Sequence, residues 1–333
     1  MIGARRSALA AALVLSLVAV FLLTRGVPPP KPNPSGTFSF AVLGDAPYYP
    51  WEDVQYPLIL REMDAYDLSW ILHVGDIFWH PCTDDNYRRI LKWLAGLAHP
   101  VIYTPGDNEG VDCWEAGSGG FDPQERIARI RQIFFDHPSA SLGQTSLPLV
   151  RQGGHGPFSE FVENARWEHA GFLFATVDLV GSRNGTEPAA ARTQADRAAA
   201  QRRTDAATAW LKEAFAEARA HGAAAVVIGF HANMGLEEAA DDLYRQAYEP
   251  FLTSLEEETE AFHGPVLLVH GDGHKYLVDH PLVRRTTQRR LENLTRLQVP
   301  GSPLVGWVRV IVRPGSSTPF TFEEHVLPRW KFW

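Results

Sequence analysis

Carboxylate and imidazole side chains recur in one setting along this chain, directly after short apolar runs of β-type sequence. Four runs end in Gly-Asp and a fifth ends in His. The residues at these ends are Asp45, Asp76, Asp107, His231 and Asp272, followed closely by His274. One aspartate after a strand is often only the N-cap of the next helix. Five such ends in succession favour a shared metal site, because carboxylates and imidazoles bind divalent cations.

The runs that carry these residues are continuous and apolar, which is typical of strands covered on both faces. They span residues 38–43, 70–74, 100–105, 224–230 and 265–270. Ligands gather at the carboxyl ends of such strands in open α/β sheets. A helix expected over Tyr56–Tyr66 and another capped by Thr83 or Asp84 make two βαβ crossovers. These crossovers place the first three aspartates at the same edge of one sheet.

The remaining chain continues the alternation of helices and strands. Helices are expected over Gln124–Phe135 and Ala190–Ala220, and a loop over Gly143–Gly156. Further strands are expected within Trp167–Val180 and in a closing antiparallel pair, Gly306–Val312 with Phe320–Phe322. We find no internal repeat and no second domain boundary, so residues 37–333 are predicted to form one catalytic domain.

The amino-terminal residues 1–24 predict an export segment. Arg5 and Arg6 precede an apolar run from Ala8 to Leu23, which is intermediate in length between a signal-peptide core and a membrane span. A cleaved signal and an uncleaved anchor both fit, and the anchor is favoured. The Pro-rich residues 25–36 predict a stiff linker. We therefore expect an exported, periplasmic or extracytoplasmic protein tethered to the inner membrane, with no membrane contact beyond this segment.

Composition and cysteine usage agree with that interpretation. The net charge of −8 argues against a nucleic-acid partner. Cys82 and Cys113 follow Asp76 and Asp107, in loops that lie side by side if their strands are neighbours. In an exported protein a disulfide between them is favoured over two unpaired cysteines or thiolate metal ligands.

The order of these motifs resembles the calcineurin-like metallophosphoesterases. That family has Asp-x-His, Gly-Asp, Gly-Asn-His-Glu/Asp, His and Gly-His-x-His in succession. The resemblance covers residues 37–322, and Tyr103–Glu109 followed by Asp112-Cys113 resembles a divergent bacterial branch of the superfamily. It implies an α/β fold of two packed mixed β-sheets flanked by helices, a four-layer α/β/β/α sandwich. It also implies a dinuclear metal site whose bridging hydroxide attacks a phosphate ester.

The same resemblance implies a ligand set. One metal would be held by Asp45, Asp76 and His274. The other would share Asp76 and add Asp107, His231 and Asp272. Oxygen-rich donors of this kind suit manganese, magnesium, calcium or iron better than zinc. The implied cofactors are two divalent or mixed-valence ions, with manganese, iron, magnesium and zinc as the candidates.

Departures from the family pattern bear on the chemistry. Pro47 replaces the first-motif histidine, which leaves Tyr48, His80 or water to complete the first metal. Asn108 stands where the family has the histidine that stabilises the leaving group, and an amide donates a hydrogen bond but no proton near neutral pH. His80, His155 and His270 are alternative acids, and none is assigned. Glu109 either orients a ligand or is an ordinary cap.

Two more departures replace neutral ligands by carboxylates, at Asp107 and Asp272. The added negative charge repels a phosphate dianion more than a monoanion, which favours a diester over a monoester. The expected substrate is a phosphate-ester small molecule or a phosphorylated partner. The alternative is a scaffold domain that has lost catalysis, which Pro47 and Asn108 support. A glycosidase would explain the aspartates but leave His231 and His274 unused.

Overall fold

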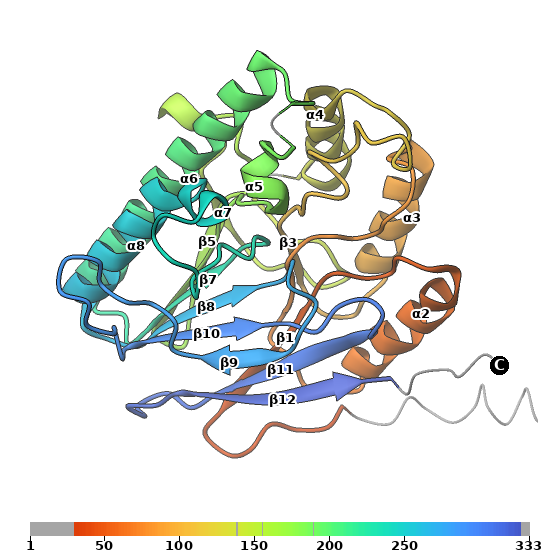
Figure 1. Cartoon of the computed structure of the whole chain (residues 1–333). Helices are drawn as coiled ribbons and strands as arrows, with labels where there is room; N and C mark the ends of the chain where they lie inside the picture. Colours follow the sequence, from red (N-terminus) through yellow and green to blue (C-terminus); the bar gives the residue numbers. More distant parts are fainter. Residues whose placement is uncertain (1–29, 138, 155, 189, 328–333) are drawn as a thin grey trace, which may run out of the picture.

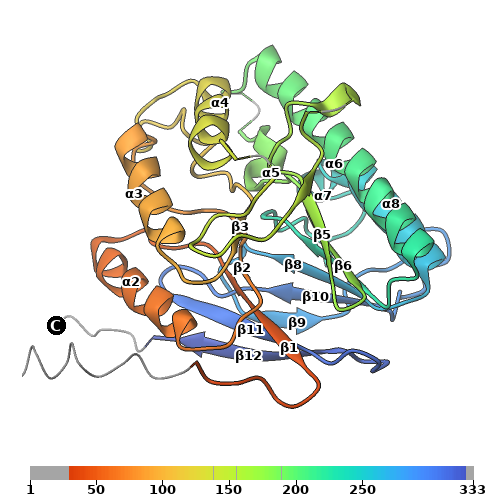
Figure 2. The same ribbon diagram turned by 180° about the vertical axis from the view of Figure 1, so that it is seen from behind.

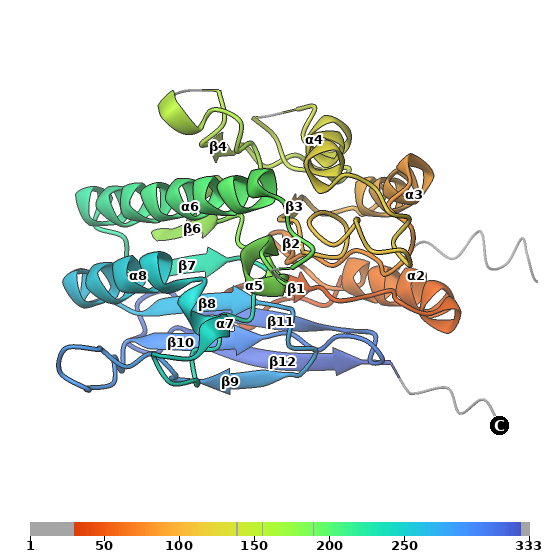
Figure 3. The ribbon, with the colours of Figure 1, turned by 45° about the horizontal axis from the view of Figure 1, so that its top comes forward.

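The protein is a four-layer sandwich of two mixed β-sheets between two layers of helices (Figures 1 and 3). The computed structural model describes residues 30–327 except 138, 155 and 189. Three apolar cores hold the layers together. One, around Phe40, Trp70 and Phe174, fills the space between the sheets, and the other two lie beneath the helices on each outer face. The predicted fold class is confirmed.

The five-stranded sheet has the order β12-β11-β1-β2-β3. Its strands are β1 (Phe38–Leu43), β2 (Ile71–His73), β3 (Val101–Tyr103), β11 (Gly306–Val312) and β12 (Phe320–Val326). β1, β2 and β3 are parallel, whereas β11 pairs antiparallel with both β1 and β12. The closing antiparallel pair and the shared edge of the first three aspartates are therefore confirmed.

The seven-stranded sheet has the order β4-β5-β6-β7-β8-β10-β9. Its strands are β4 (Val150–Arg151), β5 (Ala165–His169), β6 (Phe172–Thr176), β7 (Val226–Gly229), β8 (Val266–His270), β9 (Leu277–Asp279) and β10 (Leu294–Gln298). β6, β7, β8 and β10 run parallel. The parallel neighbours β7 and β8 deliver His231, Asp272 and His274 to one edge. β4 lies inside the stretch that we expected to be a loop.

Helices cover the outer face of each sheet (Figure 2). α2 (Pro50–Asp64), α3 (Asp84–Ala95) and α4 (Pro123–Phe134) cover the five-stranded sheet. α6 (Gln194–His221) and α8 (Glu249–Phe262) cover the other, with the short α5 (Gly181–Gly185), α7 (Leu243–Gln246) and 3₁₀ turn Gly156–Phe158 between elements. Thr83 caps α3 by accepting a hydrogen bond from the Asn86 N–H, as one of the two expected caps.

The predicted start of the first helix was wrong. α2 begins at Pro50 rather than near Tyr56, so Pro57 lies in the helix interior and not in the first turn. Proline is well suited to the first helical position, and Glu52 and Asp53 supply the negative charge that a helix amino terminus favours. These signals outweigh the cost of Pro57.

The predicted export segment, residues 1–24, and most of the linker lie outside the described residues. Within residues 30–327, with their three gaps, no helix is long and apolar enough to cross a membrane. The chain joins the domain at Lys31, whose backbone N–H donates to the Ala65 carbonyl just after α2.

Cys82 and Cys113 form a disulfide between the loops after β2 and β3. Both residues are completely buried, and their Cα atoms are 5.7 Å apart. The expected disulfide is confirmed. It links the two loops that carry Asp76 and Asp107, so it restrains the site as well as the fold.

Removing this disulfide should destabilise the domain. The cysteines are 31 residues apart, and closing a loop of that size stabilises a protein by about 3–4 kcal/mol through the unfolded state. We expect the double variant Cys82→Ala, Cys113→Ala to lose that amount in urea unfolding. A loss below about 1 kcal/mol would show that the loops are held without the disulfide.

Candidate metal centre

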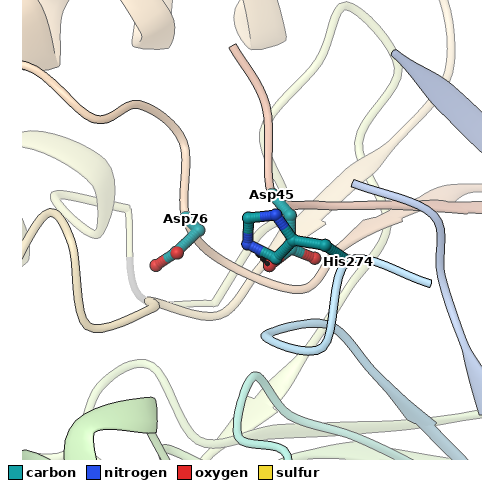
Figure 4. A group of neighbouring side chains, drawn as sticks. All are labelled: Asp45, Asp76 and His274. Carbon is teal, nitrogen blue, oxygen red and sulfur yellow. Dashed lines mark ion pairs between the residues drawn. The ribbon is translucent and has the colours of Figure 1, made fainter. Parts of the chain in front are cut away.

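Five of the six predicted ligands form two groups that share Asp76. The first group is Asp45, Asp76 and His274 (Figure 4), and the second is Asp76, Asp107 and His231. In each group one potential ligand atom from every residue lies within 4.8 Å of the others. Loops after β1, β2, β3, β7 and β8 supply these residues, so both sheets contribute. The shared aspartate is the one that the resemblance implied.

Asp272 belongs to neither group, although it lies beside both. Its backbone N–H donates to Asp45 Oδ1 at 2.7 Å. Its own Oδ2 accepts from the Asn233 N–H at 2.7 Å and from the Tyr244 hydroxyl at 3.3 Å. Asp272 therefore fixes Asp45 and is itself fixed by two donors.

Both histidines are oriented as metal-binding histidines usually are. His231 Nδ1 lies 2.7 Å from the Val74 carbonyl oxygen, and His274 Nδ1 lies 2.8 Å from that of Ser302. Because a carbonyl only accepts, each Nδ1 is the donor, and each Nε2 faces the carboxylates. His231 Nε2 is 2.9 Å from Asp107 Oδ1 and 3.3 Å from Asp76 Oδ1. Such backbone contacts set the tautomer and ring direction that a metal ligand needs.

Backbone conformation at the site is unusual. Asp45, Asp76, Asp272 and His274 all have left-handed φ values, between 53° and 64°. This region is sparsely populated by residues other than glycine, and such strain concentrates at functional sites. The left-handed turns direct the side chains of consecutive loops toward one point instead of along their strands.

Glycines leave the room that the carboxylates occupy. A Cβ atom at Gly106 would lie 2.1 Å from Asp76 Oδ1, and one at Gly271 would lie 2.4 Å from Asp45 Oδ2. A Cβ at Gly181 would lie 2.6 Å from Asp107 Oδ2 and 2.8 Å from Asp272 Oδ1. Any side chain at these positions would displace a candidate ligand.

Tyr48 lies where the first-motif histidine is missing. Its buried hydroxyl donates a short hydrogen bond to Asp76 Oδ2 and lies 3.4 Å from His274 Nε2. His80, the other protein candidate for that place, pairs with Asp53 instead, with 3.5 Å between His80 Nε2 and Asp53 Oδ2. Of the two side chains considered, the structure brings Tyr48 to the first group.

Sequence reasoning missed Ser182. Its hydroxyl contacts Asp107 Oδ2 at 3.0 Å and Asp112 Oδ2, while Asp112 also pairs with the buried guanidinium of Arg192. Ser182 sits in α5, where three successive residues, 182–184, adopt left-handed conformations. Asn184-Gly185 is a turn signal, but the sequence does not show that three successive residues become left-handed or that Ser182 meets Asp107.

The other expected participants are placed as follows. The backbone N–H of Asn108 donates to Asp76 Oδ1 at 3.1 Å, and its half-buried side chain makes no hydrogen bond to the described residues. Glu109 is buried and accepts from the Gly106 N–H and the Tyr103 hydroxyl, so it orients the loop before Asp107. His270 is buried against Phe230, and burial lowers its pKa to about 3, which disfavours it as an acid. His155 lies outside the described residues.

Burial governs the electrostatics of the cluster. It raises the pKa of the Asp45, Asp76 and Asp272 carboxyls, in the last case to about 7. Burial acts the same way on Asp107, but the hydrogen bond and charge of His231 bring the pKa of Asp107 below its ordinary value. Burial also disfavours the charged form of His231, yet the charge of Asp76 and the hydrogen bond to Asp107 raise its pKa well above the usual range.

These residues fit a pair of divalent cations. Asp45 Oδ2 is completely buried and has no hydrogen-bond partner among the described residues, which is costly for a carboxylate without a cation. Three buried aspartates and the half-buried Asp272 face only two imidazoles, so the metal-free cluster is short of positive charge. The donor set, rich in carboxylate oxygen with two Nε2 atoms, is one that divalent metals accept.

Known proteins resemble this chain in fold and not in sequence. No family model matches it, and no curated protein does. Among solved structures, PhoD superposes with a TM-score of 0.54 at 14% identity. The two chains share a fold. The match covers 86% of this chain and 66% of PhoD, so it leaves about a third of PhoD without a counterpart.

Two other solved structures are more weakly similar. A phosphopantetheinyl hydrolase, PptH, from Mycobacterium tuberculosis matches with a TM-score of 0.41 at 14% identity, over 81% of this chain and 92% of that one. TT1561 of Thermus thermophilus matches with 0.44 at 11% identity, over 87% and 99%.

The raised carboxyl pKa values predict how stability depends on pH. An aspartate ionises near pH 4 when unfolded, whereas Asp272 keeps its proton to about pH 7 in the folded state. The folded metal-free protein therefore binds more protons between these values, and its free energy of unfolding should fall as the pH rises from about 4 to 7. One such group contributes up to about 1.4 kcal/mol per pH unit.

Chemical unfolding of chelator-treated protein at pH 5 and pH 7 measures this slope. The variant Asp272→Asn lacks one of the titrating groups, so its decline should be shallower. Stability that rises over this range would contradict the proposed burial of neutral carboxyl groups.

Proposed function

We propose that this chain is a hydrolase of phosphate esters that uses two metal ions. The observation that carries the proposal is the pair of three-residue donor groups joined at Asp76. Besides Asp76, Asp45 and His274 would coordinate one ion. Asp107 and His231 would coordinate the other, and Asp272 would lie beside this second ion. The family resemblance in the sequence and the fold shared with PhoD support the same reaction class.

The ions would supply Lewis-acid activation of water and of the phosphoryl group. The chain itself supplies position and charge. His231 and His274 hold their Nε2 atoms toward the carboxylates through backbone contacts. Tyr48 donates to Asp76, and Ser182 contacts Asp107, so each of these carboxylates keeps a fixed direction. Manganese, iron and magnesium suit the oxygen-rich donors best, and zinc remains a candidate.

The charge of the cluster favours a diester substrate. Asp107 and Asp272 stand where the family pattern has neutral ligands, so four carboxylates would surround the proposed pair of ions. A phosphate monoester approaches as a dianion near neutral pH, whereas a diester carries one negative charge and is repelled less. Two cations, Arg183 and Lys275, directly follow Ser182 and His274, and neither has an ion-pair partner in the described part of the chain. We propose that they help to attract the substrate.

Asn108 is proposed to act on the leaving group. Its backbone is fixed by the hydrogen bond to Asp76, while its side-chain amide has no partner among the described residues. The amide is thus available to donate a hydrogen bond to a substrate oxygen. It cannot deliver a proton near neutral pH, so the natural leaving group is expected to be a good one.

The disulfide supports a location outside the cytoplasm, because such bonds persist in oxidising compartments. Together with the predicted export segment it leads us to propose a periplasmic or extracytoplasmic enzyme. Tethering to the inner membrane through residues 1–24 stays a prediction.

Activity on chromogenic esters tests the proposal. We expect the full-length protein, supplied with manganese, to hydrolyse bis(p-nitrophenyl) phosphate faster than p-nitrophenyl phosphate. Asp76→Asn should lower the rate at least about 1,000-fold, because both ions lose a ligand. As a matched control, Glu217→Gln alters a half-buried carboxylate in a peripheral group with Glu168 and His221 and should leave the rate unchanged.

Three results of these assays would contradict different parts of the proposed function. If a monoester were turned over faster than every diester, the proposed preference for diesters would be wrong, but the proposed hydrolase activity would stand. Absence of hydrolysis with each candidate metal would favour the scaffold interpretation. An Asp76→Asn variant as active as the control would remove the shared aspartate from the mechanism.

A proton donor at position 108 should broaden the range of leaving groups. We expect Asn108→His to raise the rate for alkyl diesters, whose leaving groups need a proton, by about 10-fold or more. The rate for p-nitrophenyl diesters should change little. Equal effects on both substrate types would show that Asn108 does not act on the leaving group.

A further inference from the structure

Exposed apolar side chains gather at one place on this domain. Among the described residues nine large apolar side chains are exposed, and five of them lie on or beside the first three turns of α2. These five are Tyr49, Trp51, Val54, Leu58 and Trp79, with exposed fractions between 37% and 55%. We call them the α2 apolar strip. The other four are scattered over β4, α7, β9 and β12.

Tyr48 connects the α2 apolar strip to the candidate metal centre. The ring of Tyr48, whose hydroxyl contacts Asp76, lies 6.2 Å from that of Trp79. Trp79 meets Tyr49 edge to face at 6.4 Å, and Tyr49 stacks on Trp51 at 4.5 Å. A continuous path of aromatic rings therefore leads from the site to the surface of α2.

The exposed face of α2 is apolar over its first turns and carries Arg61 and the partly exposed Glu62 near its end. Trp51, Val54, Leu58 and Arg61 are exposed and follow one another at intervals of three or four residues, so they share one face. Arg61 has no ion-pair partner in the described part of the chain. All four acids of the helix make contacts within the domain. Glu52 accepts from the Tyr48 N–H, Asp53 pairs with Arg89, Glu62 with His325, and Asp64 accepts from the Ala98 N–H.

Such a face has the composition of an interfacial helix. Tryptophan and tyrosine concentrate at the boundary between lipid and water, and arginine meets the head groups. Although the whole chain has a net charge of −8, this face is mostly apolar, and its one charge without an ion-pair partner among the described residues is the cation Arg61.

The chain joins the folded domain beside the carboxyl-terminal end of α2. Lys31 pairs through its backbone with Ala65, one residue beyond α2. The apolar run Ala8–Leu23, predicted to be an anchor, precedes this point by few residues. Residues 24–30, fully extended, span only about 25 Å. A run held in a bilayer would keep α2 close to the lipid surface.

From these observations we propose that the α2 apolar strip rests on a phospholipid bilayer and that the candidate site acts on phosphodiester lipids held in it. The second half of this statement depends on the proposed phosphoesterase function. The strip would then be a membrane contact in addition to the amino-terminal segment, which the sequence alone did not predict. A second copy of the chain or a soluble aromatic ligand are the competing occupants.

A fluorescent label tests the membrane contact without relying on activity. The two native cysteines are bonded and buried, so an introduced cysteine is the single reactive thiol. An environment-sensitive fluorophore on Leu58→Cys is compared with the same label on Val150→Cys, an exposed apolar position on β4. Both full-length variants are reconstituted in phosphatidylcholine vesicles that contain a spin-labelled lipid quencher.

We expect the label at position 58 to shift to the blue and to be quenched by the lipid, while the label at position 150 stays in water. Equal behaviour of the two labels would overturn the proposal. Shielding at position 58 without vesicles, growing with protein concentration, would assign the strip to a second copy. Shielding that a soluble nucleoside reverses would assign it to an aromatic ligand.

Hydrolysis tests the substrate class. The variant Val54→Ser, Leu58→Ser should lower hydrolysis of phosphatidylcholine in vesicles about 10-fold or more, because two apolar side chains leave the lipid. Hydrolysis of bis(p-nitrophenyl) phosphate should stay unchanged, as should both activities of the control Val150→Ser, Leu243→Ser. Equal loss on both substrates, or no lipid hydrolysis by the wild type beside an active soluble reaction, would overturn the substrate assignment. Failure of both wild-type reactions contradicts the phosphoesterase function, while the label result still decides the membrane contact.

Discussion

The structure depends on one electrostatic constraint, the burial of several aspartates around Asp76. Carboxylates at such short separations repel one another, and burial removes the water that would screen them. In the metal-free chain the conflict is eased by raised pKa values at Asp45, Asp76 and Asp272, and by His231 against Asp107. Two divalent cations would resolve it more completely, which is the physical basis of the proposed metal centre.

Many local features of the domain follow from that constraint. Gly106, Gly181 and Gly271 leave space for the carboxylates, and left-handed turns direct the side chains toward a common point. The disulfide fixes the loops that carry Asp76 and Asp107. The three apolar cores of the sandwich stabilise a cluster that is itself unfavourable in the absence of ions.

The sequence was sufficient for the layout of the site and insufficient for its supporting contacts. Apolar runs that end in Gly-Asp or His, joined by short crossovers, predicted the parallel strands and the shared edge, because handedness and strand direction leave few alternatives. The start of α2 was misplaced, since the signal of Pro50 at the first helical position was overlooked. Ser182 could not be predicted, because a left-handed turn of three residues is determined by tertiary packing. The α2 apolar strip was equally invisible, since only the fold shows which side chains of α2 are exposed.

The metal content of the protein shows whether Asp76 joins two cation sites. Elemental analysis of full-length protein purified without chelators is compared with Asp76→Asn and with Glu217→Gln, which alters the peripheral group that also includes Glu168 and His221. We expect close to two ions per chain in the wild type and in Glu217→Gln, and a sharp fall in Asp76→Asn. Little or no metal in the wild type, even after reconstitution with manganese, iron, zinc and calcium, would contradict this expectation.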